Sequence, residues 1–286
     1  MLSRPLRACY QALLRQIWEL ERTPLAFKLQ TPLDKHAWLR QGGGHGWAKV
    51  GSEHRAQTAR LLLPWLAETL QGIETLTASS LRTLVRDQFR QPLPPDAEPN
   101  DLDRAIQGIR VLSDQIHLAR GSSSATTRGV QVEVTADFVG VSAGSESSEP
   151  YKHEDDIQTL QIIEEGEEEE EEEEAGGSKL FYTYRVRVAN VGTETVQLLG
   201  RHWIIQDSRG VTVTEVPRGT RGVIGCTPII KPGTCFQYYS GTDLDEAPGS
   251  MHGSFQMAVL DDRSQPLESF DAEVAPFHFW PPSTPA

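Results

Sequence analysis

The stretch Leu180–Ala189 reads LFYTYRVRVA, and it decides the class of the fold. Large apolar side chains at Tyr182, Tyr184, Val186 and Val188 alternate with polar ones. A period of two is the pattern of a β-strand that turns one face toward a core. We therefore expect a strand here, with the tyrosines and valines buried and the intervening arginines on the opposite face.

Similar segments surround this stretch. The segment before it is Gly129–Val139, and turn sequences such as Asp207–Gly210 and Lys231–Thr234 separate the segments after it. The Pro-Gly centre of the second turn favours type II geometry. Short strands at this spacing predict a β-sandwich over residues 125–282. The further predicted strands are Val196–Gln206, Val211–Val216, Cys235–Ser240, Ser254–Leu260 and Leu267–Val274.

Residues 1–120 follow a helical period instead. Apolar residues recur every three or four positions, which predicts helices over 4–21, from about Pro64, after Ser79-Ser80 and over about 100–119. We expect one of the two serines to cap the third helix and 121–124 to form a flexible linker. Residues 23–57 have no clear period and are expected to form a loop. The predicted fold class is α+β with two domains, 1–120 and 125–282.

The net charge of −13 belongs to one segment. Residues 154–174 hold thirteen acidic residues and no Lys or Arg, so the remainder of the chain is close to neutral. This acidic, low-complexity insert, 142–178, separates the first two strands and is predicted to be disordered. Because no uncompensated basic patch stands out, nucleic acid is not an expected partner.

The remaining composition excludes several classes of protein. Three cysteines form neither a disulfide framework nor a zinc-type cluster, so we expect a reducing compartment, no metal and no cofactor. No apolar run approaches the roughly 18 residues needed to span a bilayer. The start carries Arg4, Arg7 and Arg15 before the first acid, Glu19. This favours a mitochondrial location, and otherwise a cytoplasmic one, unless the segment is simply the first helix of the mature fold.

Four segments in the second half resemble the ApaG domain. They carry the family's motifs in order over more than half of the chain, so the sandwich is identified as a member of that family. The resemblance implies an immunoglobulin- or fibronectin-III-like sandwich that acts in protein interaction, with no catalytic activity. The segments are QLLGRHWIIQD at 197–207, GVIGCTP at 222–228, PGTCFQYYSG at 232–241 and GSMHGSFQM at 249–257.

The glycine-rich stretch Gly219–Gly225 suggests a phosphate-binding loop at first sight. Phosphate loops lead into a helix N-terminus, whereas here a β segment with Pro228 follows. The glycines are therefore favoured as bends between strands. The alternative is an anion-binding regulator that holds pyrophosphate or a nucleotide. The residues of that hypothesis are Arg218, Gly219, Arg221, Gly222 and Gly225.

The sequence offers no catalytic site. In an alternating strand Arg201 and Trp203 face one side and His202 the other. We expect Trp203 in the core and Arg201 bonded to a neighbouring loop, which gives the segment a structural role. No Ser or Cys nucleophile has a His and an acid at recognised spacing. A metal-dependent phosphohydrolase, a third hypothesis, would need a metal cluster that the sequence does not show.

The helical part resembles the LYR-motif proteins. Residues 6–15, LRACYQALLR, are similar to the start of that family, and 85–90, VRDQFR, to its later R-x-x-F-R element. Cys9 and Gln11 replace two letters of the motif, and about 22–78 would be an insertion. The resemblance implies a three-helix bundle that binds an acyl carrier protein. The partner-binding residues it implies are Tyr10, Leu13, Arg15, Arg86, Phe89 and Arg90.

Together these observations predict an adaptor or assembly factor without chemistry of its own. The LYR-like helices would contact an acyl carrier protein or a similar acidic partner, and the sandwich would contact a second protein. The sequence leaves the oligomeric state open.

Overall fold

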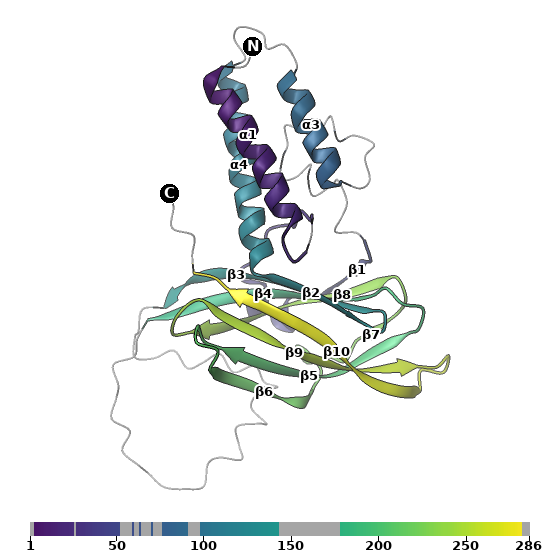
Figure 1. Ribbon diagram of the computed structural model, residues 1–286. Helices are drawn as coiled ribbons and strands as arrows, with labels where there is room; N and C mark the ends of the chain where they lie inside the picture. The colour runs from purple at the N-terminus through teal and green to yellow at the C-terminus, as the bar shows by residue number, and fades with distance from the viewer. Residues whose placement is uncertain are drawn as a thin grey trace.

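The structure is a computed structural model that describes residues 3–25, 27–51, 59, 63, 70, 76–90, 98–142 and 178–281. Within these residues, two packed β-sheets form a sandwich, and three α-helices stand over the face of one sheet (Figure 1). The helices are α1 (Arg4–Glu21), α3 (Ala78–Arg90) and α4 (Glu98–Arg120). The predicted combination of helices followed by a β-sandwich is confirmed, while the finer immunoglobulin or fibronectin-III topology stays a prediction.

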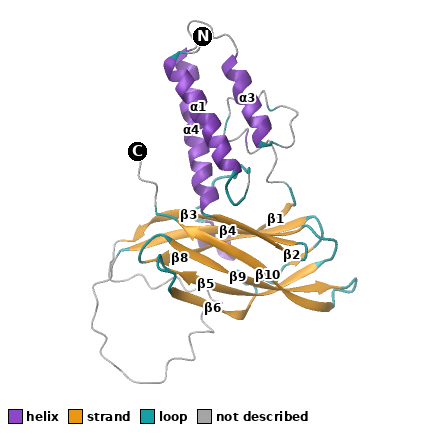
Figure 2. Cartoon of the chain, viewed as in Figure 1, coloured by secondary structure: helices purple, strands orange, loops and turns teal. Residues whose placement is uncertain are grey.

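The strands pair in two antiparallel sheets (Figure 2). One sheet has the order β1-β8-β4-β3-β2, and the other has the order β10-β9-β5-β6, with β7 paired to the start of β5. The strands are β1 (Gly46–Lys49), β2 (Ser122–Thr127), β3 (Val130–Ser142), β4 (Lys179–Asn190), β5 (Val196–Gln206), β6 (Thr212–Arg221), β7 (Ile229–Ile230), β8 (Thr234–Leu244), β9 (Gly249–Leu260) and β10 (Pro266–Phe279).

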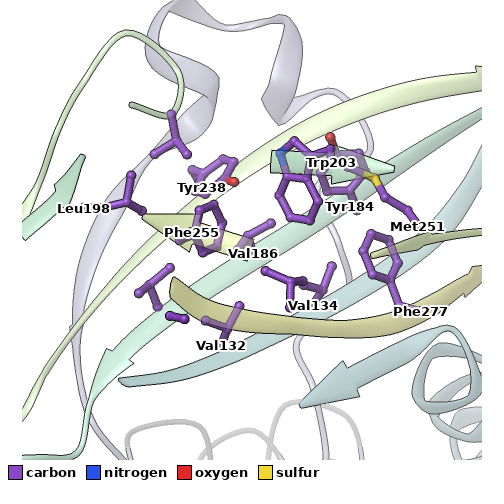
Figure 3. Close-up of a cluster of buried hydrophobic side chains, with 14 of the residues drawn as sticks. Val132, Val134, Tyr184, Val186, Leu198, Trp203, Tyr238, Met251, Phe255 and Phe277 are labelled. Carbon is purple, nitrogen blue, oxygen red and sulfur yellow. The ribbon is translucent and has the colours of Figure 1, made fainter. Parts of the chain in front are cut away.

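The core lies between the two sheets (Figure 3). Aromatic rings pack edge to face within it, such as Trp203 against Phe255 with ring centroids 5.4 Å apart. Such contacts add to the stabilisation that burial of apolar area provides. The predicted alternation of β4 is confirmed, because Tyr182, Tyr184, Val186 and Val188 all belong to this core.

The linker predicted at 121–124 is wrong. Residues from Ser122 onward form β2, which pairs with β3 along its whole length. Ser122 and Ser123 are buried, and Ser122 Oγ donates a hydrogen bond to the carbonyl oxygen of Leu118 in α4. Helix α4 therefore continues directly into the sandwich, and the pairing partner β3, rather than local composition, sets the conformation.

Part of the loop predicted at 23–57 belongs to the sandwich. Strand β1 adds to β8, with Trp47 opposite Phe236, at the edge of the first sheet. Two short 3-10 helices, η1 (Ala37–Leu39) and η2 (Gln41–Gly44), precede it. A small apolar cluster, made of Leu33, Ala37, Leu118 and Tyr239, packs this segment against α4 and β8.

The helices have a core of their own. It joins the buried sides of α1, α3 and α4. The cap of α3 is Thr77 rather than Ser79 or Ser80, because Thr77 Oγ1 accepts from the Ser80 amide at 3.1 Å and Ser80 Oγ accepts from the Thr77 amide at 2.8 Å. The second predicted helix lies outside the described residues.

The acidic insert joins two neighbouring strand ends. Ser142, the last residue of β3, pairs with Lys179, the first residue of β4. Apart from the two residues at its ends, the insert predicted at 142–178 lies outside the described residues. None of the described helices is long and apolar enough to cross a membrane.

Candidate functional site

The predicted anion-binding stretch divides into the end of β6 and a tight hairpin turn. Arg218 lies in β6 and makes a two-pronged ion pair with Asp271 of β10, at 3.0 Å from Nε and 2.8 Å from Nη2. The same hydrogen bond raises the pKa of the guanidinium. Arg221 is exposed at the end of the strand. An anion would have to compete with Asp271 for Arg218.

Two glycine amides of this stretch already have acceptors. Gly219 N–H donates to Gln256 Oε1 at 3.2 Å, and Gly222 N–H donates to the Leu199 carbonyl oxygen at 2.8 Å. Ile224 and Gly225 then turn the chain with φ values of +45° and +77°. Positive φ at both turn residues is typical of a type I′ hairpin, in which glycine is favoured. This turn accounts for the glycine at position 225. Anion binding here stays a prediction.

The Arg201-His202-Trp203 segment has the structural role expected for two of its residues. Trp203 is buried in the core, and Arg201 Nη1 donates to the carbonyl oxygens of Arg221 and Gly222 at 3.1 and 2.9 Å. These bonds hold the stem of the hairpin turn against β5. His202 Nε2 lies 3.1 Å from Glu215 Oε1 of β6, on the opposite face of the strand.

The structure brings together only part of the predicted LYR-like set. The rings of Tyr10 and Phe89 are in contact, with centroids 5.2 Å apart. Leu13 is buried in the helical core, where it packs with residues of all three helices. An acyl chain entering the bundle would have to displace such side chains. The other members of the set, Arg15, Arg86 and Arg90, are exposed.

The exposed face of α1 is basic. Arg4, Arg7, Arg15 and Arg22 lie within about 80° of one another around the helix, at 100° per residue, opposite the buried side. Trp18 belongs to the same face, is 52% exposed and lies under the Arg22 guanidinium at 4.4 Å. We call these five residues the α1 stripe.

The acidic residues of α1 do not neutralise the positive charge of the stripe. Glu19 pairs with Arg120 of α4, and Glu21 pairs with Arg82 of α3, so both carboxylates turn toward neighbouring helices. No described acidic residue pairs with the four arginines of the stripe. Sequence reasoning noted three of these arginines but missed Trp18 and Arg22. Arg22 lies seven positions after Arg15, and Trp18 lies fourteen positions after Arg4. This spacing was the signal that could have placed them on one face.

A separate hollow of about 380 Å³ lies where α4 meets β3. Asp137 faces it together with Lys35, whose Nζ is 3.3 Å from the carboxylate, and His117, at 4.0 Å. Burial raises the pKa of Asp114, and the nearby His117 opposes this. Among the described residues, no three His, Cys, Asp or Glu side chains are arranged to hold a metal ion.

The described residues form a two-sheet β-sandwich joined to a helical unit. A family model for the ApaG domain matches residues 169–259. Protein ApaG of Methylobacillus flagellatus is 41% identical over 100 residues, which are 35% of this chain and 72% of the relative. Protein ApaG of Acidovorax sp. is 44% identical over 95 residues, 32% of this chain and 67% of the relative. The chain therefore belongs to the ApaG family.

Two solved structures are also similar to this chain. An X-ray structure from a structural-genomics programme has a TM-score of 0.38 at 29% identity, covering 54% of this chain and 89% of that one. The crystal structure of the putative ApaA protein from Bordetella pertussis has a TM-score of 0.36 at 25% identity, covering 54% and 95%. The bacterial relatives named above match about a third of this chain. The LYR resemblance of the helices stays a prediction.

Proposed function

We propose that the protein is a non-catalytic interaction adaptor. The helical unit would bind an acidic protein through the α1 stripe, and the sandwich would bind a second protein. The observation that carries the proposal is the stripe itself, four exposed arginines and an exposed tryptophan on one helix face with no described acidic partner. Arg and Trp are the residue types that most often dominate binding energy at protein interfaces.

The charge of the partner follows from the stripe. Exposed arginines attract an acidic surface at long range and fix its orientation, and salt weakens this attraction. Two further exposed arginines, Arg86 and Arg90, lie on the neighbouring helix, α3. Because such a surface fits an acyl carrier protein, the LYR resemblance makes that protein the first partner to test. Binding of the carrier's protein surface does not require that its acyl chain enter the helical core.

The location of the protein stays a proposal. The Arg-rich start that favours mitochondria forms α1, which buries Leu13 in the core that it shares with the other helices. The same arginines therefore have a second explanation, as the partner-binding face of a folded helix.

The proposal is tested with the full chain and a purified acyl carrier protein in a direct titration. Arg7→Glu with Arg15→Glu should weaken binding by about tenfold or more, because each change replaces attraction with repulsion. The matched control is Arg110→Glu, an exposed arginine of α4 that lies outside the stripe. Wild-type binding should weaken steeply with salt, and the double variant should lose most of that dependence.

Equal weakening by the control and the double variant would show a general charge effect, and the stripe would lose its role. If the carrier does not bind, the same titration is repeated with acidic proteins recovered by affinity purification from the native source. If the double variant still binds all of these proteins, the proposal is overturned.

A further inference from the structure

One side of the sandwich is closed and the other is open. On the closed side, β10 packs over β2 and β3. Side chains of β2 form hydrogen bonds with main-chain groups of β10. Thr127 Oγ1 accepts from the Glu273 amide at 3.1 Å, and Ser123 Oγ donates to the Ala275 carbonyl oxygen at 2.7 Å. On the open side, β6 ends its sheet, and within the described residues β5 is its only strand neighbour.

The outer stretch of β6, Thr212–Val216, reads TVTEV. Four of its five residues are β-branched, and all are exposed or half-exposed. An exposed edge of this composition is a template for another strand. Pro217, which edge strands tolerate, and a register shift between Arg201 and Trp203 end this stretch. A second register shift, between Ile205 and Gln206, falls within it.

An apolar slot lies beneath this edge. It has a volume of about 230 Å³ and opens between β6 and β8. Thr214 and Val216 of β6 line one wall, and Trp203, Tyr238 and Ile224 line others. Burial raises the pKa of the Tyr238 hydroxyl well above its ordinary value, as expected for a dry, apolar interior.

A second, acidic hollow adjoins the slot. It has a volume of about 640 Å³, and it shares Thr214, Gly241 and Thr242 with the slot. Lys179 pairs with Asp243, and Arg209 pairs with Asp207, but Asp245 and Glu246 also face the hollow. Four carboxylates therefore meet two cations, which leaves the hollow negative.

We propose that the β6 edge and these two hollows bind an extended segment of a partner protein. The segment adds a strand to β6, places one apolar side chain in the slot and places a Lys or Arg over the acidic hollow. In a strand, residues two or four positions apart face the same side, so the two anchors need that spacing. The inference rests on the proposed function, in which the sandwich contacts a second protein, and it names the form of that partner.

The size of the slot favours a side chain over a free ligand. Pockets that bind small molecules usually have volumes of roughly 300–1,000 Å³ and bury most of the ligand. The slot is smaller than that range and open, and it suits a single Leu or aromatic side chain held there by main-chain pairing. The acidic hollow selects the charge of the segment.

The probe is a fluorescent eight-residue peptide, Thr-Val-Thr-Leu-Thr-Lys-Val-Thr, in which Leu and Lys lie two positions apart. Binding to the full chain is followed by fluorescence anisotropy. A second peptide has Glu in place of Lys. The Lys peptide should bind more tightly than the Glu peptide by roughly two- to fivefold, the range of an exposed charge pair. Amide exchange should slow at Thr212–Val216 when the peptide is bound.

Two pairs of variants locate the contact. Thr214→Arg fills the junction of the two hollows and should weaken binding by about tenfold. Its control is Ser269→Arg, an exposed position of β10 at the opposite edge of the same sheet. Asp245→Lys should abolish the preference for the Lys peptide, and Asp262→Lys, in the turn between β9 and β10, should leave it intact.

Equal binding of the two peptides, or slowed exchange elsewhere than β6, would overturn the proposal. Dimerisation of the free chain that Thr214→Arg abolishes would also overturn it, because the edge would then bind a second copy. Variants of the α1 stripe should leave peptide binding unchanged. If the helical part of the proposed function is wrong, the stripe variants will change no acidic partner's binding, while the wild-type chain will still bind the peptide.

Discussion

The two faces of the sheet that contains β4 are both buried, but by different chemistry. On the inner face, Tyr182, Tyr184 and Val186 pack against the second sheet. On the outer face, Thr183 and Arg185 are just as inaccessible to water. The inner face is covered by apolar side chains, whereas the outer one is covered by a polar segment from the first part of the chain. The difference shows that alternation in a strand predicts side-chain chemistry, and that burial depends on what covers each face.

Gln30 is the centre of the outer face. Its main chain exchanges two hydrogen bonds with the Gln115 side chain of α4, at 2.6 and 3.0 Å. Its side-chain Oε1 accepts from Arg185 Nη2 of β4 at 2.7 Å and from Thr135 Oγ1 of β3 at 2.8 Å. One residue thus connects a helix and two strands. These hydrogen bonds fix α4 against the first sheet of the sandwich.

The inner face is expected to be the more sensitive to truncation. Phe236→Ala removes a ring that is 1% exposed and contacts Tyr238 with centroids 6.2 Å apart. Because the site is closely packed, we expect the free energy of unfolding to fall by about 3–5 kcal/mol. Urea denaturation measures this change, and Phe236→Leu should lower the free energy of unfolding by less. A loss below about 1 kcal/mol would show that the inner face is loosely packed.

The outer face should respond to loss of a single acceptor. Gln30→Leu leaves Arg185 Nη2 and Thr135 Oγ1 without their acceptor, which should lower the free energy of unfolding by about 1–3 kcal/mol. Arg185→Met should cost less, because it also removes a buried charge whose pKa is already lowered by desolvation.

A double-mutant cycle separates the two contributions. The variant with both changes should be more stable than the sum of the single losses by about 1 kcal/mol, since the first change removes the interaction that the second would break. Losses that add to within about 0.5 kcal/mol would mean that the hydrogen bond between Gln30 and Arg185 contributes nothing.

The smallest expected effect on the free energy of unfolding comes from changing one polar group on the inner face. The Tyr182 hydroxyl is buried without a hydrogen-bond partner among the described residues, and burial raises its pKa to about 12. Because the folded pKa lies above the ordinary value of 10.0, the stability due to the neutral hydroxyl is complete below pH 10 and is lost as pH rises toward 12.

Tyr182→Phe should therefore change the free energy of unfolding by less than about 1 kcal/mol at neutral pH. It should also reduce the loss of stability between pH 10 and 12. The outer face has comparable atoms, Gln30 Nε2 and Arg185 Nε, which also lack partners among the described residues. Denaturant titrations of the wild type and the variant at several pH values make the test, and identical pH profiles would contradict it.

Local patterns predicted the elements that carry strong periodicity. The bounds of α1 and β5 match the expectation, because each has a long run of one period and clear turn residues at its ends. Of the three strands that were missed, β1, β2 and β7, the first two have no such pattern. Gly46–Lys49 is only four residues long, and Ser122–Ser124 has no β-branched residue, so pairing with β8 and β3 determines their conformation.

The candidate sites were predictable only in part. Tyr10 contacts Phe89 and Leu13 is buried in the helical core, while partner binding by the LYR-like set stays a prediction. The pairing of Arg218 with Asp271 joins residues 53 positions apart and leaves no local signal. The β6 edge was likewise hidden, because the order of strands in a sheet follows from the whole fold.

The claim that the outer face joins both parts of the chain into one body has a direct test. Native-state hydrogen exchange of the full chain compares the amides of Gln30 and Trp47 with those of Tyr184–Val188 in β4. The account predicts the same free energy of opening for all of them, because the covering segment and the sheet unfold together. Exchange at Gln30 and Trp47 that is faster by about a hundredfold or more would show that the segment opens alone, and would contradict the account.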